Sequence, residues 1–172
     1  MVRKVEVTAY DPNWPVNYEK EAVNLKKIFG GELLEIHHIG STSIPEMDAK
    51  PIIDVLMVVQ DITKIVSFNR DMQRAGYIPK GENGIPGRRF FIKGDELHHT
   101  HHLHVFQKEH ADITRHINFR DYLIAHPQEA NEYARLKHAL ANQYPVNIDS
   151  YQSGKEEFIR EIDQKAMVLN KG

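Results

Sequence analysis

Apolar residues recur with two different periods along this chain, and the change between them separates a sheet-forming part from a helical part. Strand-like runs, each bounded by glycine, proline or polar turn residues, fall at 3–10, 33–39, 51–59, 77–79, 88–93 and 98–107. Helical spacing predicts helices over 16–29, 62–75, 113–125, 128–143 and 153–169. The pattern indicates an α+β fold: a mixed sheet flanked by helices, followed by a helical C-terminal extension. We expect one domain over residues 1–172, with its sheet core in about 1–110 and the C-terminal helices in about 112–170.

The run 51–59 is apolar at every position except Asp54, which is typical of a strand buried on both faces. An ionised carboxylate buried without a partner costs many kcal/mol of free energy, so it must be hydrogen-bonded, paired, metal-bound or protonated. Asp54 is therefore a candidate functional group.

A loop of glycine and small hydroxyl residues precedes this strand: Gly40, Ser41, Thr42 and Ser43. Such a loop exposes backbone N–H groups and hydroxyls that suit phosphate oxygens. Divalent cations that accompany phosphates prefer carboxylate oxygens, which Asp54 would provide. The structural alternative is that the hydroxyls cap a short helix and that Asp54 makes a structural pair.

Five histidines fall within residues 98–104. Strand alternation places Leu103 and Val105 toward a core and points His102 and His104 the other way. With Asp54 on a neighbouring strand, these two histidines could hold zinc, manganese or iron, donate to a phosphate, or act as acid–base groups. They could equally be tolerated on a half-exposed strand. The other histidines are expected in the loop before the strand: His98, His99 and His101.

Basic residues bracket the apolar centre of the strand at 88–93. Alternation places Arg89 and Lys93 on one face and Arg88 on the other. Arginine forks and lysine ammonium groups bind phosphate, so these three residues and Lys50 are candidate phosphate contacts. The alternative for each is a solvated charge at a strand end.

Bulk composition narrows the classes of protein and partner. The formal net charge is −2 and the pI is about 6.6, so no general nucleic-acid-binding surface is expected. No apolar run approaches the roughly 20 residues that span a bilayer, and no signal-peptide core is present. The absence of cysteine fits a reducing compartment, so we expect a cytoplasmic protein. From the candidate site we expect a small-molecule partner. The sequence does not define the oligomeric state.

Several strings along the chain resemble, in this order, the GrpB family of uncharacterised proteins. They are "YDPNWP", "HIGSTSIPEMDAKPIIDV", "GENGIPGRRFF", "THHLHVF", "FRDYLIAHP", "YARLKHALA" and "YQSGKEEFI". The family is placed in the nucleotidyltransferase-like superfamily, so the resemblance implies a nucleotidyltransferase-like mixed sheet flanked by helices. It brings no settled substrate.

In the superfamily signature, a hydrophobic residue and Gly-Ser precede a strand that carries the metal-binding carboxylates. Here twelve residues separate Gly40-Ser41 from Asp54, which is about the distance in the signature. Residues that match it are Ile39, Gly40, Ser41, Asp54, Val55 and Met57. By this resemblance Gly40 and Ser41 would contact a triphosphate, Asp54 would hold Mg²⁺ or Mn²⁺ (with Zn²⁺ as an alternative), and His102 or His104 would replace a further carboxylate. Leu56 stands where the second metal-binding carboxylate should be.

Three hypotheses follow, and they leave enzymatic activity open. The first is a nucleotide or phosphorylated small molecule bound with a divalent metal, with nucleotidyl transfer in which Asp54 and His104 act. A second is a non-catalytic phosphate-binding domain, which Leu56 favours. The third is a mononuclear His–Asp metal site acting on a phosphate ester.

Overall fold

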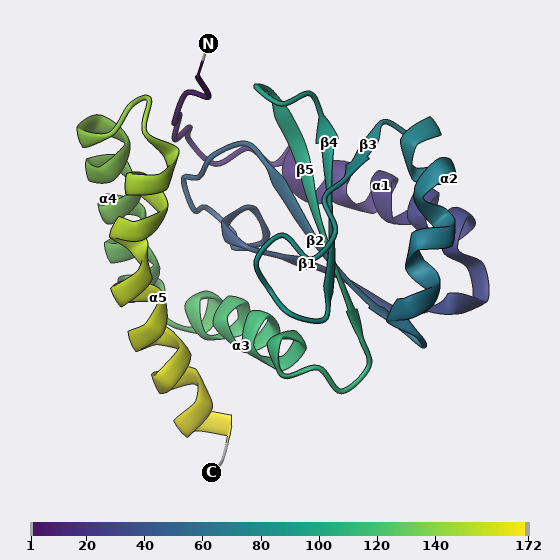
Figure 1. Cartoon of the computed structure of the whole chain (residues 1–172). Coiled ribbons are helices and arrows are strands. Elements are labelled where there is room, and N and C mark those ends of the chain that lie inside the picture. The colour runs from purple at the N-terminus through teal and green to yellow at the C-terminus, as the bar shows by residue number, and fades with distance from the viewer. Residues whose placement is uncertain (1, 171–172) are drawn as a thin grey trace.

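The computed structural model describes residues 2–170 and contains one mixed sheet, ordered β1-β2-β5-β4-β3 (Figure 1). The strands are β1 (Leu33–Ile39), β2 (Ile53–Val59), β3 (Tyr77–Pro79), β4 (Arg88–Gly94) and β5 (His99–Gln107). β2 and β5 run parallel at the centre, and the remaining neighbours pair antiparallel. The parallel register places Asp54 beside His102.

Helices cover both faces of the sheet. One face carries α1 (Asn13–Phe29), η1 (Gly30–Glu32), the 3₁₀ helix η3 (Ile62–Phe68) and α2 (Asn69–Arg74). The other carries α3 (Ala111–Ala125) and the short 3₁₀ helix η2 (Ser41–Ser43). The helices α4 (Pro127–Gln143) and α5 (Ile148–Asn170) lie side by side beyond that face, as Figure 1 shows. The predicted α+β architecture with a helical C-terminal extension is confirmed.

Alternation along β2 sends its side chains to two different cores. Val55 and Met57 are fully buried against α1, in the larger apolar cluster. Leu56 faces the other way, where it is fully buried with Ile39 and Phe106 beneath α3. Asp54 shares the face of Leu56 but lies one pleat earlier, where this apolar cover ends.

Several sequence predictions were wrong in detail. β5 begins at His99, so His99 and His101 lie in this strand and not in the loop before it. Residues 3–10 form no strand, because Val5 bonds to Pro145 while Thr8 bridges to Ala49, so no single strand partners the segment. The segment 62–75 is helical, but its first turns are 3₁₀ and only Asn69–Arg74 is α-helix. α5 begins at Ile148 rather than at 153.

Gly154 explains how α5 can pack closely on α4. A Cβ atom at this position would overlap the methyl groups of Leu140, so a larger residue would require the Leu140 side chain to move. Within residues 2–170, no helix is both long enough and apolar enough to cross a membrane.

Candidate anion-binding site

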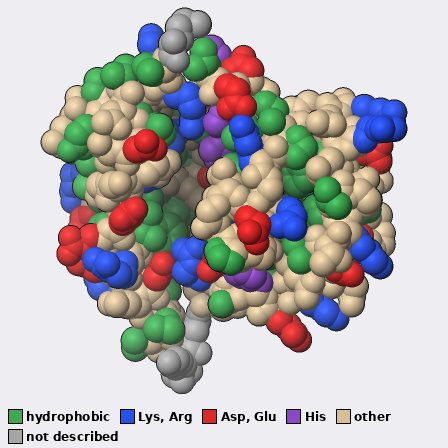
Figure 2. All heavy atoms as spheres, in the orientation of Figure 1, with side chains coloured by type: hydrophobic (Ala, Val, Ile, Leu, Met, Phe, Trp, Pro, Cys, Tyr) green, Lys and Arg blue, Asp and Glu red, His purple; other side chains and the backbone are tan. Residues whose placement is uncertain are grey.

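A cavity of about 290 Å³ lies where the start of β2 and the middle of β5 meet the C-terminal helices. Figure 2 shows a hollow between the helical extension and the sheet, with lysine, arginine and histidine side chains along its upper margin. The sheet side contributes Gly40, Ser41, Thr42, Lys50, Asp54, His102 and His104. The helical side contributes Arg115, His116, Tyr133, Lys137, Tyr151 and Lys155. Among the described residues that line it, Asp54 is the only acidic one.

Gly40 brings the loop after β1 directly against Asp54. Its φ is +73°, a conformation that side chains with a Cβ rarely adopt, and an added Cβ would lie 2.6 Å from Asp54 Oδ2. The glycine in the sequence motif is therefore required by two independent constraints. Because Gly40 meets both constraints, the loop can lie in direct contact with the carboxylate of Asp54.

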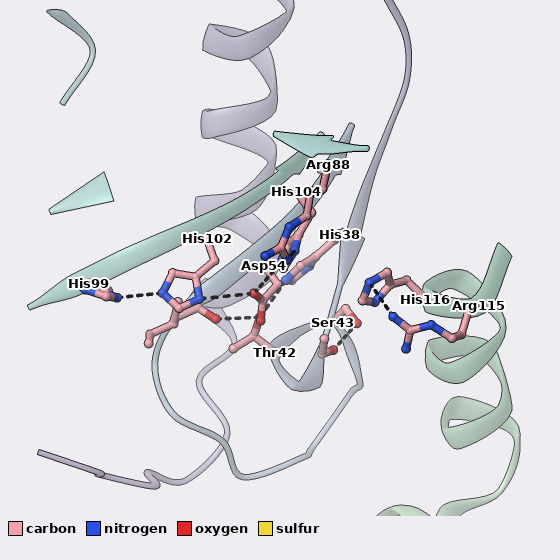
Figure 3. A network of polar contacts seen from close by, with 12 residues as sticks. His38, Thr42, Ser43, Asp54, Arg88, His99, His102, His104, Arg115 and His116 are labelled. Atoms are coloured by element: carbon pink, nitrogen blue, oxygen red, sulfur yellow. Dashed lines mark hydrogen bonds and ion pairs between the residues drawn. The ribbon is translucent and has the colours of Figure 1, made fainter. Parts of the chain in front are cut away.

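Asp54 accepts a hydrogen bond from His104, whose Nε2 lies 3.2 Å from Asp54 Oδ1 (Figure 3). The opposite ring nitrogen of His104, Nδ1, lies 3.2 Å from Nη1 of Arg88. A guanidinium has only N–H donors, so Nδ1 must accept and the proton of neutral His104 is on Nε2. Arg88 is held in turn by the carbonyls of Glu82 and Asn83.

His102 approaches the same carboxylate oxygen, with Nδ1 3.8 Å from Asp54 Oδ1. Its Nε2 lies 2.8 Å from Nδ1 of His99, so the chain His99–His102–Asp54 runs along one wall (Figure 3). Burial lowers the pKa of His102 to about 3, with the Asp54 charge opposing the shift. Burial alone would raise the pKa of Asp54, but the His104 hydrogen bond and the neighbouring His102, His104 and Lys50 charges lower it to about 2. At neutral pH the carboxylate is ionised and His102 is neutral.

The hydroxyl residues of the loop have different roles. Ser43 donates its hydroxyl to the Gly40 carbonyl, and Thr42 is buried, with its hydroxyl 2.9 Å from Nε2 of His38. Both therefore hold the loop in shape. Ser41 lines the cavity and is the hydroxyl best placed to meet a ligand.

Three lysines reach the cavity from three separate segments, and the structure pairs none of them with a carboxylate. Lys50 precedes β2, Lys137 lies on α4 and Lys155 on α5. Within residues 2–170, the acids whose charge acts on Lys137 and Lys155 contact histidines: Asp54 accepts a hydrogen bond from His104, and Asp48 lies 2.9 Å from His138.

Aromatic rings and one carbonyl hold these ammonium groups in place. Nζ of Lys137 donates to the main-chain carbonyl of Asp48 at 2.7 Å and lies 4.6 Å from the ring centre of Tyr133. Lys50 and Lys155 both lie over the ring of Tyr151, at 5.0 and 4.7 Å. Tyr151 is fully buried, and its hydroxyl has no hydrogen-bond partner among the described residues.

Burial and mutual repulsion lower the lysine pKa values. Burial lowers the pKa of Lys137 to about 7, and the Lys155 charge adds to the shift. Burial likewise lowers the pKa of Lys155 to about 7, with help from Lys50, whose own pKa falls to about 8. The site therefore gathers three basic groups around one carboxylate, and among the described residues none of the three lysines has a carboxylate oxygen within 4 Å.

Two predicted phosphate contacts lie away from this cavity. Lys93 is on the α1 face of the sheet, where it pairs with Glu21 at 2.9 Å in a buried cluster that includes the Tyr77 hydroxyl. Arg89 shares that face by strand alternation and donates to the carbonyl of Arg88. The structure brings neither to Asp54, because adjacent strand residues point to opposite faces. Arg88 lies on the cavity side but behind His104.

The donor atoms around Asp54 are too few for a complete metal site. No group of three or more potential ligands is arranged to hold a metal ion within residues 2–170. His104 cannot coordinate through Nε2 while Arg88 donates to its Nδ1, whereas a ligating histidine needs an acceptor behind it. His102 can leave Nδ1 free, since His99 is able to accept. Asp54 and His102 thus provide two ligands, fewer than the three that catalytic zinc sites use. Leu56, at the position of the second carboxylate in the superfamily signature, is buried in an apolar cluster and provides no ligand.

Several cavity residues were not predicted from the sequence. Arg115 and His116 come from α3, and Lys137 and Tyr151 from the C-terminal helices. Lys137 did carry a signal: it shares a helix face with Tyr133 and Leu140, so a charge there interrupts a buried stripe in the same way as Asp54 interrupts its strand.

The chain is thus an α+β protein whose basic cavity surrounds one carboxylate on a central strand. Residues 4–165 match the family described as GrpB protein, and the chain belongs to that family. A relative, UPF0157 protein YqkA of Bacillus subtilis (strain 168), is 49% identical over 170 residues, which are 99% of this chain and 49% of that protein. The chain therefore spans about half the length of that relative.

One solved structure agrees with the family assignment. The crystal structure of conserved protein GrpB from Enterococcus faecalis matches with a TM-score of 0.93 and 40% identity, over 97% of this chain and all of that one. A structure of the Cid1 poly(U) polymerase matches with a TM-score of 0.47 and 11% identity, over 77% of this chain and 45% of that one. A likeness of that size assigns no activity or ligand to this chain.

Proposed function

We propose that this protein binds a phosphorylated small molecule, with nucleotides as the first class to test, in the cavity around Asp54. The observation that carries the proposal is the convergence of Lys50, Lys137 and Lys155 without a carboxylate partner among the described residues. Lys137 is buried and Lys50 and Lys155 are partly buried, so their charged forms lose hydration that a bound phosphate would replace. Charge-assisted hydrogen bonds to phosphate oxygens are among the stronger polar contacts in proteins.

The two sides of the cavity define how such a ligand would lie. Its phosphate would lie against the three lysines and the unpartnered hydroxyl of Tyr151, with Ser41 and the Gly40 backbone nearby. Asp54 is ionised and would repel phosphate, so it would accept hydrogen bonds from a hydroxyl or amino group of the same molecule. The cavity volume is at the lower end of the range for small-molecule sites.

A thermal-shift screen of nucleotides and other phosphorylated metabolites, each in EDTA and in Mg²⁺ or Mn²⁺, tests the proposal. A ligand at 100 times its Kd stabilises by about 2.7 kcal/mol, which moves Tm by several degrees. We expect a shift that Lys137→Met removes and that Lys27→Gln, an exposed charge on α1, retains. No shift from any phosphorylated compound would overturn the proposal.

A second function, nucleotidyl transfer, has support from one specific arrangement: Gly40 lies directly against Asp54 and Ser41 lines the same cavity, as the superfamily signature implies. A divalent cation would be held by Asp54 and His102, and would polarise a phosphate of the bound nucleotide. Because two protein ligands are few, phosphate oxygens and water would complete its coordination. Metal-dependent release of pyrophosphate, lost in Asp54→Asn, would support transfer; a ligand shift of equal size in EDTA without any product would favour binding alone.

A further inference from the structure

A second hollow, of about 510 Å³, adjoins the first on the other side of Lys50. It lies between the N-terminal segment and the residues that lead into β5, and the two hollows share Lys50 and Ile52 in their walls. In Figure 2, lysine, arginine and histidine side chains lie along the upper margin of the cleft toward the N-terminal end of the chain, with acidic side chains among them. The basic lining therefore extends beyond the site around Asp54.

The N-terminal segment that forms one wall is attached to the body of the protein. The N–H of Val5 donates to the carbonyl of Pro145 at 2.9 Å, and Val5 is buried against Leu140 and Tyr151. Three residues later, Thr8 bridges to Ala49, next to Lys50. These two contacts, both on the C-terminal side of Arg3, fix the segment that places Arg3 at the second hollow.

The charges around the second hollow favour an anion. Arg3 and Lys4 face it from the N-terminal segment together with Glu6, Lys50 faces it from the entry to β2, and His99 faces it from β5. Within residues 2–170, Arg3 and Lys50 have no carboxylate oxygen within 4 Å, and the buried Nε2 of His99 has no hydrogen-bond partner. A phosphate oxygen could accept from His99 and from both of these cations.

Repulsion within this row of cations supports the same conclusion. Burial lowers the pKa of Lys50 to about 8, and the Arg3 charge is the next cause. Burial also lowers the pKa of Arg3, with Glu96 on the adjacent turn opposing the shift. Lys50 in turn acts on Lys155, so the positive charges follow one another from Arg3 to Lys155.

We infer that the second hollow is a second phosphate-binding subsite, lined by Arg3, Lys4 and His99, and that Lys50 lies between the two bound anions. It would let the protein hold a second phosphate group beside the ligand of the first cavity. The contact between His99, which lines the second hollow, and His102, which lines the first beside Asp54, links the two sites. This inference rests on the proposed function, but phosphate binding at Arg3 can be tested separately from binding in the first cavity.

Backbone amide NMR during a titration with inorganic phosphate, near pH 7, tests it. We expect two groups of resonances that saturate with different apparent Kd values: one at 40–42 and 152–156, the other at 3–6 and 97–99. Arg3→Gln should weaken the second response at least fivefold and leave the first unchanged. Lys137→Met should do the reverse, and Lys27→Gln should change neither.

The outcomes separate the two proposals. A first response without a saturable second response, or a second response that Arg3→Gln leaves unaltered, would overturn the second subsite and leave the proposed function standing. Loss of the first response alone in Lys137→Met, with the second intact, would support two independent anion positions. If neither region responds to phosphate, both proposals fail.

Discussion

His104 donates from Nε2 to Asp54 Oδ1 over 3.2 Å while Arg88 occupies its other ring nitrogen. This relationship makes His104 a hydrogen-bond donor to the carboxylate and opposes its use as a metal ligand. It also explains why Arg88 is buried without a carboxylate beside it: two backbone carbonyls and one imidazole take its N–H groups.

The tautomer of His104 is a direct prediction of this arrangement. Long-range ¹H–¹⁵N NMR should find the proton on Nε2 in the native protein. Arg88→Met should allow the Nδ1–H form, since nothing would then donate to Nδ1. Arg89→Met is the matched control, because its side chain lies on the other face, and it should leave the His104 signals in place. A native Nδ1–H tautomer would contradict the account and restore His104 as a possible ligand.

Gly40→Ala should destabilise the fold. The new Cβ would meet Asp54 Oδ2 at 2.6 Å in a backbone with φ of +73°, and strain of this kind costs about 1–3 kcal/mol. Gly31→Ala serves as the control, because no atom lies within 4 Å of its added Cβ and its φ is not positive. Urea denaturation should give a lower free energy of unfolding for Gly40→Ala and nearly the native value for Gly31→Ala. Equal values would show that the loop does not need glycine against the carboxylate.

Stability without ligand should rise between pH 7 and pH 9. Lys137 and Lys155 have folded pKa values of about 7, below the usual value of 10.5, so the unfolded chain binds more protons in this range. Proton binding by the unfolded state lowers the stability of the fold, and this contribution weakens as the proton concentration falls, so stability rises with pH wherever the unfolded state binds more protons. The range stops short of pH 10, where buried tyrosines with raised pKa values begin to act in the opposite direction.

Denaturation midpoints at pH 7 and pH 9 measure this slope. Lys137→Met should flatten it, because one of the buried bases is gone, whereas Lys27→Gln should reproduce the native slope. A native slope of zero, or one unaffected by Lys137→Met, would mean that these lysines remain charged in the fold.

Much of the sheet was predictable because its strands carry local signals. The apolar run at 51–59 and the alternation after His101 each specify a strand, and alternation alone places His102 and His104 on one face. What alternation could not tell was which strands pair. The parallel register that brings Asp54 beside His102 depends on the crossover through β3 and β4, a nonlocal property.

The helical wall of the cavity was harder to predict. The positions of Lys137, Tyr151 and Arg115 depend on how the C-terminal helices pack on the sheet. Helical spacing predicts which face of each helix is buried, but it does not predict which element that face contacts. The same limit explains Arg89 and Lys93, which were expected near phosphate: a sheet face can be assigned, but the sequence does not say which face carries the site.

The central claim is that buried lysines opposite Asp54 bind phosphate, and isothermal titration calorimetry with pyrophosphate at pH 7 tests it most directly. Saturable binding by the native protein should weaken at least tenfold, about 1.4 kcal/mol, in Lys137→Met and in Lys155→Met, and should persist in Lys27→Gln. Binding of equal strength in all four proteins, or no binding to the native protein, would contradict the account.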